Sequence, residues 1–132
     1  ISLGPRSDRN WELKINKKAK TKALFMSLSD KASNGRFIVV DDFSTLTPKT
    51  KEFAKVYAAF AGKIKDFGKK QLILVPKKTD PIARASRNMP EISHTLANSL
   101  NIVDILKADA IILTRDSLPI IEKTYLKEVK AK

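Results

Sequence analysis

The sequence predicts an α/β protein with a mostly parallel sheet of about four strands and helices on both faces. Three short runs, at 37–40, 71–75 and 110–114, are apolar apart from Gln71 and Thr114 at their ends, and they are rich in β-branched residues. Strands of this kind are typically buried on both faces, as they are in a parallel sheet between two helix layers. Segments with helical spacing of apolar side chains alternate with these runs, which is the order of β-α-β units with right-handed crossovers.

The first part of the chain reads as an arm followed by a helix. Residues 1–15 contain the turn signal Gly4-Pro5 and show no helical period, so we expect an extended basic arm. Asn16 is predicted to cap a helix that Gly35 ends. This helix has apolar stripes on two sides, which predicts packing between two neighbours.

The remaining elements follow in a regular order. After a buried strand at 37–40, Thr47 is expected to cap a helix that has Pro48 in its first turn and stops near Gly62. We then expect a strand at 71–75, a short helix over 81–89, a weak strand from Ile92 to Leu96, a helix from an Asn101 cap to Leu106, a strand at 110–114 and a last helix starting near Asp116-Ser117. Residues 16–132 are therefore predicted to form a single three-layer globular domain with Rossmann-like topology.

The charge of the chain is large and unevenly distributed. The 132 residues carry a formal net charge of +12, and residues 1–36 and 48–80 each carry nine basic and three acidic side chains. Residues 81–114 are neutral, with three of each. Concentrated positive charge indicates a polyanionic partner, and no apolar run is long enough to span a membrane. The absence of cysteine excludes disulfide scaffolds, thiolate zinc sites and cysteine nucleophiles.

Catalytic motifs are weak. The four glycines form neither G-x-G-x-x-G nor a P-loop, so the dinucleotide motif of Rossmann folds is missing. His94, the only histidine, has no predicted orienting partner. Asp41 and Asp42 follow the first strand and could hold Mg²⁺ for phosphoryl transfer or nuclease chemistry, although structural ion pairs are common at such positions. We expect no enzyme activity, no cofactor, no metal and no small-molecule substrate, and keep the Mg²⁺-dependent enzyme as the alternative.

A basic cluster at the start of the chain is the strongest functional signal. It comprises Arg6, Arg9, Lys14, Lys17, Lys18, Lys20 and Lys22, with Trp11 among them. Lysine and arginine neutralise phosphates, and an aromatic ring can stack on an unpaired base. The alternatives are a solvated basic face and a Trp11 that anchors the arm to the core. Lys49 and Lys51, at the start of the second helix, and Arg87 are further candidates for RNA binding.

Five stretches of the sequence, in order, resemble one known family. They are G-P-R-S-D-R-N-W-E-L-K-I-N-K-K (4–18), L-S-D-K-A-x-x-G-R-x-x-V-V-D-D-F (28–43), T-P-K-T-K-E-F (47–53), S-R-N-M-P (86–90) and L-N-I-V-D-I-L-K-A-D (100–109). Together they resemble the C-terminal globular part of the bacterial-type large-subunit ribosomal protein L-four family. The N-terminal strand and the extended tunnel loop of that family have no counterpart in these residues, and we expect a fragment or processed product, since the chain begins with Ile1.

The resemblance implies a structural constituent of the large ribosomal subunit that supports early subunit assembly. Its partners would be large-subunit (23S-type) rRNA, neighbouring large-subunit ribosomal proteins and, as in some members, the leader mRNA of its own operon. The implied location is the cytoplasmic ribosome, with an organellar ribosome as the alternative. A non-ribosomal mRNA-binding regulator is a further alternative. The resemblance also implies RNA-facing roles for the basic cluster and for Lys49 and Lys51. It places Arg87 and Asn88 in a turn, where Arg87 serves either RNA contact or turn structure and Asn88 favours turn structure.

Overall fold

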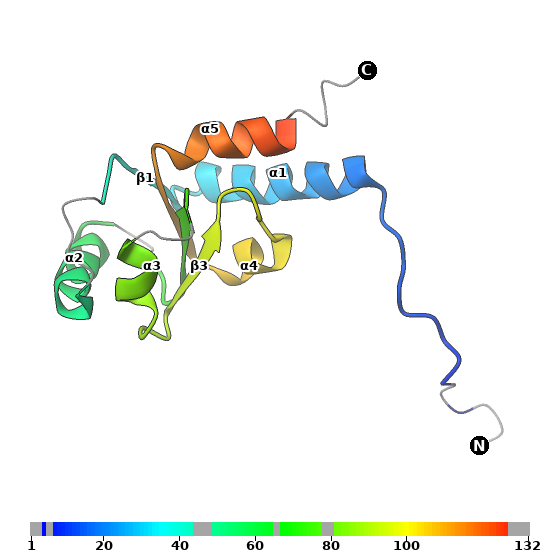
Figure 1. Ribbon diagram of the computed structural model, residues 1–132, viewed down its shortest axis with the longest axis horizontal. Helices are drawn as coiled ribbons and strands as arrows, with labels where there is room; N and C mark the ends of the chain where they lie inside the picture. The colour runs from blue at the N-terminus through cyan, green and yellow to red at the C-terminus, as the bar shows by residue number, and fades with distance from the viewer. Residues whose placement is uncertain (1–3, 5–6, 44–48, 65–66, 78–80, 127–132) are drawn as a thin grey trace.

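Figure 1 shows the computed structural model, in which helices surround a four-stranded parallel sheet. The structure describes residues 4, 7–43, 49–64, 67–77 and 81–126. The helices are α1 (Lys17–Ser33), α2 (Thr50–Lys63), α3 (Pro81–Ser86), α4 (Ile102–Lys107) and α5 (Ser117–Ile121), which continues into a π-helical turn, η1 (Glu122–Leu126). The strands are β1 (Phe37–Val40), β2 (Gln71–Val75), β3 (Ile92–Leu96) and β4 (Ala110–Thr114).

The sheet has the strand order β1-β4-β2-β3, and all three strand pairs are parallel. The two central strands, β2 and β4, are buried along their whole length, as their largely apolar sequences predict. The prediction of a fully buried strand at β1 is wrong, because three of its residues are only partly buried and Val39 is 48% exposed. β1 is an edge strand, so only β4 lies beside it within the described sheet.

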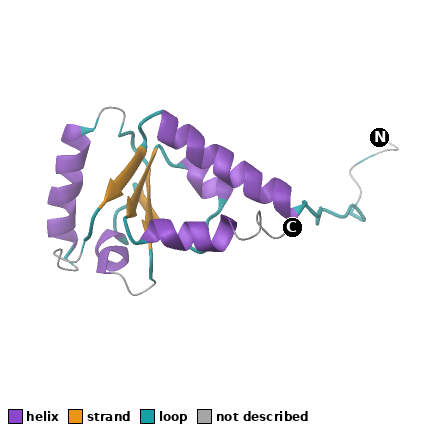
Figure 2. Ribbon diagram, turned by 90° about the horizontal axis from the view of Figure 1, so that it is seen from above, coloured by secondary structure: helices purple, strands orange, loops and turns teal. Residues whose placement is uncertain are grey.

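Two hydrophobic cores lie on opposite faces of the sheet, which confirms the predicted α/β architecture. Successive residues of β2 alternate between them: Leu72 and Leu74 belong to one core, Ile73 and Val75 to the other. The first core contains residues of α1, α4 and α5, and the second contains residues of α2 and α3. Figure 2 shows the resulting layers, with helices on both sides of the strands.

Helix α1 agrees with its predicted extent and differs from its predicted packing. It runs from Lys17 to Ser33, and Gly35 adopts a φ of +67° just beyond it. Asn16 occupies the N-cap position without a capping hydrogen bond from its side chain. Leu24 is buried, whereas Met26 on the second apolar side is 63% exposed, so the helix packs on one side only and the predicted two-sided packing is wrong.

The shorter elements match their predictions with small shifts in their ends. The Asn101 side chain accepts a hydrogen bond from the N–H of Val103, 3.2 Å away, as expected for the cap of α4. Helix α3 ends at Ser86, earlier than the predicted residue 89, in a turn where the N–H of Met89 donates to the Ser86 carbonyl. The predicted cap at Thr47-Pro48 lies outside the described residues. Among the described helices, none is long and apolar enough to cross a bilayer.

Candidate nucleic-acid interface

The arm before α1 is exposed and runs away from the sheet (Figure 1). Trp11 is 74% exposed, and the Arg9 guanidinium lies 4.3 Å from the centre of its ring, in a cation–π contact. Leu13 and Ile15 are also exposed. The structure therefore does not support Trp11 as an anchor to the core. The open Arg9–Trp11 pair presents one cationic group and one aromatic face to any partner that approaches the arm.

The first turns of α1 concentrate positive charge without local compensation. Lys17, Lys18, Lys20 and Lys22 are all exposed, and the first turn of the helix contains no acidic residue. Uncompensated lysines here oppose the helix dipole, whose N-terminal end is already positive. We call the exposed set Arg9, Trp11, Lys14, Lys17, Lys18, Lys20 and Lys22 the basic arm-and-helix surface.

The lysines of α1 point to two flanks of the helix. Each residue turns the helix by about 100°, so Lys18 and Lys22 share one flank. Lys17 and Lys20 lie on the other flank, where both line a pocket of about 290 Å³. The remaining walls of this pocket come from the loop before α4, from α4 itself and from η1, and the full lining is Lys17, Lys20, Thr21, Leu24, Leu100, Ile102, Thr124 and Tyr125.

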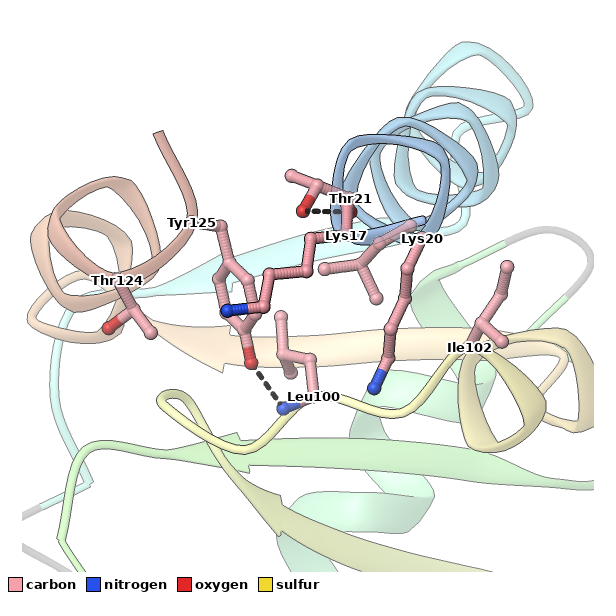
Figure 3. Close-up of a pocket in the computed structure, with 8 residues that line it drawn as sticks. Lys17, Lys20, Thr21, Leu100, Ile102, Thr124 and Tyr125 are labelled. Carbon is pink, nitrogen blue, oxygen red and sulfur yellow. Dashed lines mark hydrogen bonds between the residues drawn. The ribbon is translucent and has the colours of Figure 1, made fainter. Parts of the chain in front are cut away.

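One hydrogen bond fixes the geometry of the pocket (Figure 3). The Tyr125 hydroxyl accepts the N–H of Leu100 at 2.6 Å, which ties η1 to the loop between β3 and α4. The Lys17 and Lys20 side chains extend from α1 toward these two elements. No carboxylate lines the pocket within the described chain, so it combines two cations with apolar walls. Sequence reasoning did not find this pocket, because its walls are up to 108 positions apart and share no spacing signal.

The structure does not gather every predicted RNA-binding residue into one face. Lys49 and Lys51 are exposed at the start of α2, and Arg87 is exposed just after α3. Both helices pack on the sheet face opposite to α1, so these three side chains are separate from the basic arm-and-helix surface. Arg6 lies outside the described residues. Asn88 is an exposed residue of the turn after α3, as the resemblance implies.

The candidate catalytic residues from the sequence, His94, Asp41 and Asp42, do not form a metal-binding cluster with other described side chains. His94 is exposed on the edge strand β3. Asp41 and Asp42 are exposed directly after β1. In the described part of the chain, no three histidine, aspartate or glutamate side chains come together in a way that could hold a metal ion. Nothing in this geometry favours the Mg²⁺-dependent enzyme.

The similarity of this chain to known proteins extends over the basic arm-and-helix surface. The family model described as the ribosomal protein L4/L1 family matches residues 1–124. Among curated relatives, the large ribosomal subunit protein uL4 of Parabacteroides distasonis is 36% identical over 123 residues, which cover 93% of this chain and 56% of the relative. The uL4 protein of Natranaerobius thermophilus is 31% identical over 125 residues, which cover 95% of this chain and 58% of the relative.

A third relative agrees with these two. The uL4 protein of Thermoanaerobacter sp. strain X514 is 36% identical over 126 residues, with 95% of this chain and 57% of the relative covered. The chain thus spans somewhat more than half the length of the relatives it matches. Since the family model covers nearly the whole chain, including the arm and α1, this chain belongs to the ribosomal protein L4/L1 family.

Proposed function

We propose that this chain is a structural, non-catalytic component of the large ribosomal subunit and that it binds large-subunit rRNA through the basic arm-and-helix surface. Its contribution to the ribosome would include support of early subunit assembly, next to neighbouring ribosomal proteins in the cytoplasm. The relatives carry the name of a large-subunit protein, and this chain belongs to their family.

One observation carries the proposal: cations at the start of the chain are exposed and close together. Residues 9–22 contain six basic side chains and one acidic side chain, Glu12. Every one of the six is exposed. Phosphates neutralise such a set and release counterions, which supplies most of the affinity of basic proteins for nucleic acid. An exposed tryptophan beside an arginine adds a face on which an unpaired base can stack.

A charge reversal tests the proposal. The variant Lys17→Glu/Lys18→Glu/Lys20→Glu is compared with wild type for binding to a large-subunit rRNA fragment by filter binding at several salt concentrations. We expect the variant to lose binding while its circular dichroism stays unchanged, because all three side chains are exposed. For wild type, about 6–10 phosphate contacts predict a loss of about 10³-fold or more in affinity between 50 and 200 mM salt.

A matched control variant separates the effect of charge at this surface on RNA binding from the effect of the net charge of the chain. The variant Lys55→Glu/Lys63→Glu/Lys69→Glu changes the net charge by the same amount at exposed positions outside the predicted set. It should keep most of the wild-type affinity at moderate salt. Equal loss in both variants, or retained binding in the first, would contradict the assignment of this surface. Co-sedimentation of the wild-type chain with large subunits distinguishes the ribosomal role from that of an mRNA regulator.

A further inference from the structure

The pocket beside α1 has a composition suited to one class of ligand. Its volume of about 290 Å³ lies just below the usual range for small-molecule sites, about 300–1,000 Å³. The largely buried side chains of Leu24 and Leu100 form an apolar wall of the pocket, and Tyr125 supplies an aromatic ring. Lys17 and Lys20 supply two ammonium groups, which extend from α1 toward Tyr125 and toward the loop before α4 (Figure 3). A ligand that fits all of these features is both apolar and anionic.

We propose that this pocket receives a single unpaired RNA nucleotide, with its base against the apolar wall and Tyr125 and its phosphates on Lys17 and Lys20. This inference rests on the proposed rRNA-binding function and adds a specific site to it. A nucleotide joins a flat, weakly polar base to a charged phosphate, which is the combination that the walls present. Lysine is a compact point charge, so it can hold a phosphate from several directions without fixing the base.

Two other occupants fit the walls less well. A free phosphate would use the lysines and leave the apolar wall and the tyrosine ring in water. An apolar side chain from a protein partner would cover the wall and desolvate two ammonium groups without neutralising them. Because no carboxylate lines the pocket within the described residues, an anionic ligand meets no repulsion there.

One hydroxyl in the pocket is placed to donate a hydrogen bond to the edge of a base. The Tyr125 hydroxyl accepts the Leu100 N–H and keeps its own proton for donation. The Thr21 and Thr124 hydroxyls instead donate to the carbonyls of Lys17 and Ile120 in their own helices. Among the three hydroxyls of the pocket, that of Tyr125 therefore has the proton available for a ring nitrogen or carbonyl of the base, while the apolar wall accepts any base.

Short probes test the pocket directly. The ¹⁵N-labelled chain is titrated with the single-stranded tetranucleotides rU₄ and rA₄, with tripolyphosphate and with hexaglutamate, and the amide shifts of Lys20, Leu100 and Tyr125 are followed. We expect saturable shifts with a tetranucleotide at a Kd at least fivefold below that for either other probe. Equal binding of tripolyphosphate would show a charge-only site, and preference for hexaglutamate would show an acidic peptide site. Either result overturns the proposal.

Variants that fill the pocket complete the test. Thr124→Trp and Ile102→Trp place a large side chain on two different walls without changing the charge, and Ser29→Trp is the control at an exposed position of α1 outside the pocket. We expect at least one folded filling variant to lose the tetranucleotide shifts, whereas Ser29→Trp keeps them. If every filling variant that folds by circular dichroism binds the tetranucleotides as wild type does, the proposal is wrong.

The charge requirement is tested in the same way. Lys17→Gln/Lys20→Gln should weaken tetranucleotide binding by about tenfold or more, whereas Lys55→Gln/Lys63→Gln removes the same charge from α2 and should change it little. Filter binding of the rRNA fragment runs in parallel. A chain that binds the fragment without tetranucleotide shifts at the pocket refutes this inference alone, and a chain that binds neither refutes the proposed function as well.

Discussion

Gly68 and Asp109 lie so close together that no residue with a Cβ fits at position 68 without a clash. A Cβ on Gly68 would lie 2.2 Å from the Asp109 Cβ, and Gly68 itself adopts a φ of +71°. The Asp109 carboxylate accepts hydrogen bonds from the N–H groups of Lys69 and Lys70, at 2.7 and 2.9 Å. This contact fixes the turn that leads into β2 against the residue that precedes β4, at the amino ends of the two central strands.

Replacing Gly68 by alanine should destabilise the fold more than the same change at Gly35. Both glycines have positive φ, where a Cβ costs roughly 1–2 kcal/mol, but a Cβ at Gly35 would meet nothing within 4 Å. We expect Gly35→Ala to lower the free energy of unfolding by about 1 kcal/mol. Gly68→Ala adds a clash, and we expect a loss of about 3 kcal/mol, on the scale of strained backbone plus displaced packing. Urea unfolding measures both, and equal losses would contradict the close approach.

The elements that sequence reasoning predicted best are those whose burial follows from their own composition. β2 and β4 are apolar apart from Gln71 and Thr114 at their ends, and the sheet buries both strands completely. The sequence at 37–40 is also apolar and β-branched, yet β1 lies at an edge, because strand order depends on contacts between distant segments. Local pattern therefore predicts that a strand exists, and tertiary packing decides how far it is buried.

Side chains whose role depends on distant partners were not predictable. Lys31 is buried, and its ammonium donates to the Ala108 carbonyl at 2.6 Å, across 77 positions of sequence. A basic residue in the last turn of a helix indicates a dipole interaction at most. The exposure of Trp11 was equally unpredictable, since a single aromatic residue in an arm packs on the core or projects into solvent according to surfaces that the sequence does not reveal. The pocket at Lys17, Lys20 and Tyr125 has the same origin.

Acid should remove part of the stabilisation that Asp109 provides. Hydrogen bonds from the N–H groups of Lys70 and Lys69, followed by the charges of Lys31 and Arg36, hold the pKa of Asp109 below its ordinary value. A carboxyl with a lowered folded-state pKa contributes stability above its unfolded pKa, about 3.9, and loses it as the pH falls through the folded value. Asp109→Asn should therefore be less stable than wild type at pH 7, and the difference should narrow below about pH 4.

Urea midpoints between pH 7 and pH 2.5 measure this effect. Asp116→Asn, at an exposed position, controls for the loss of one negative charge from a strongly basic chain. If the difference in urea midpoint between wild type and Asp109→Asn stays constant from pH 7 to pH 2.5, the ionised carboxylate is not what holds the turn.

Removing the Tyr125 hydroxyl should destabilise the fold through the group that it leaves behind. In Tyr125→Phe the N–H of Leu100, a buried residue, loses its acceptor. A fully buried donor without a partner costs about 1–3 kcal/mol, and this one is only partly buried, so we expect a loss of about 1 kcal/mol in the free energy of unfolding. Thr124→Val, which removes an exposed hydroxyl from the adjacent position, should stay within about 0.5 kcal/mol of wild type. An equally small loss in Tyr125→Phe would show that water replaces the hydroxyl.

Trp11 should report directly on whether the arm contacts RNA. It is the only tryptophan, so the intrinsic tryptophan fluorescence of the chain belongs to it alone, and its exposure predicts efficient quenching by acrylamide in the free protein. An rRNA fragment bound to the basic arm-and-helix surface covers the Arg9–Trp11 pair, and a stacked base protects the ring further. We expect the acrylamide quenching constant to fall severalfold when a saturating rRNA fragment is added at low salt, and to recover as salt releases the RNA.

The variant Trp11→Phe/Ser29→Trp moves the reporter to an exposed site of α1 outside the surface and should remain fully quenchable in the complex. Protection of both reporters would indicate RNA wrapped over the whole helix, and protection of neither would place the arm outside the interface.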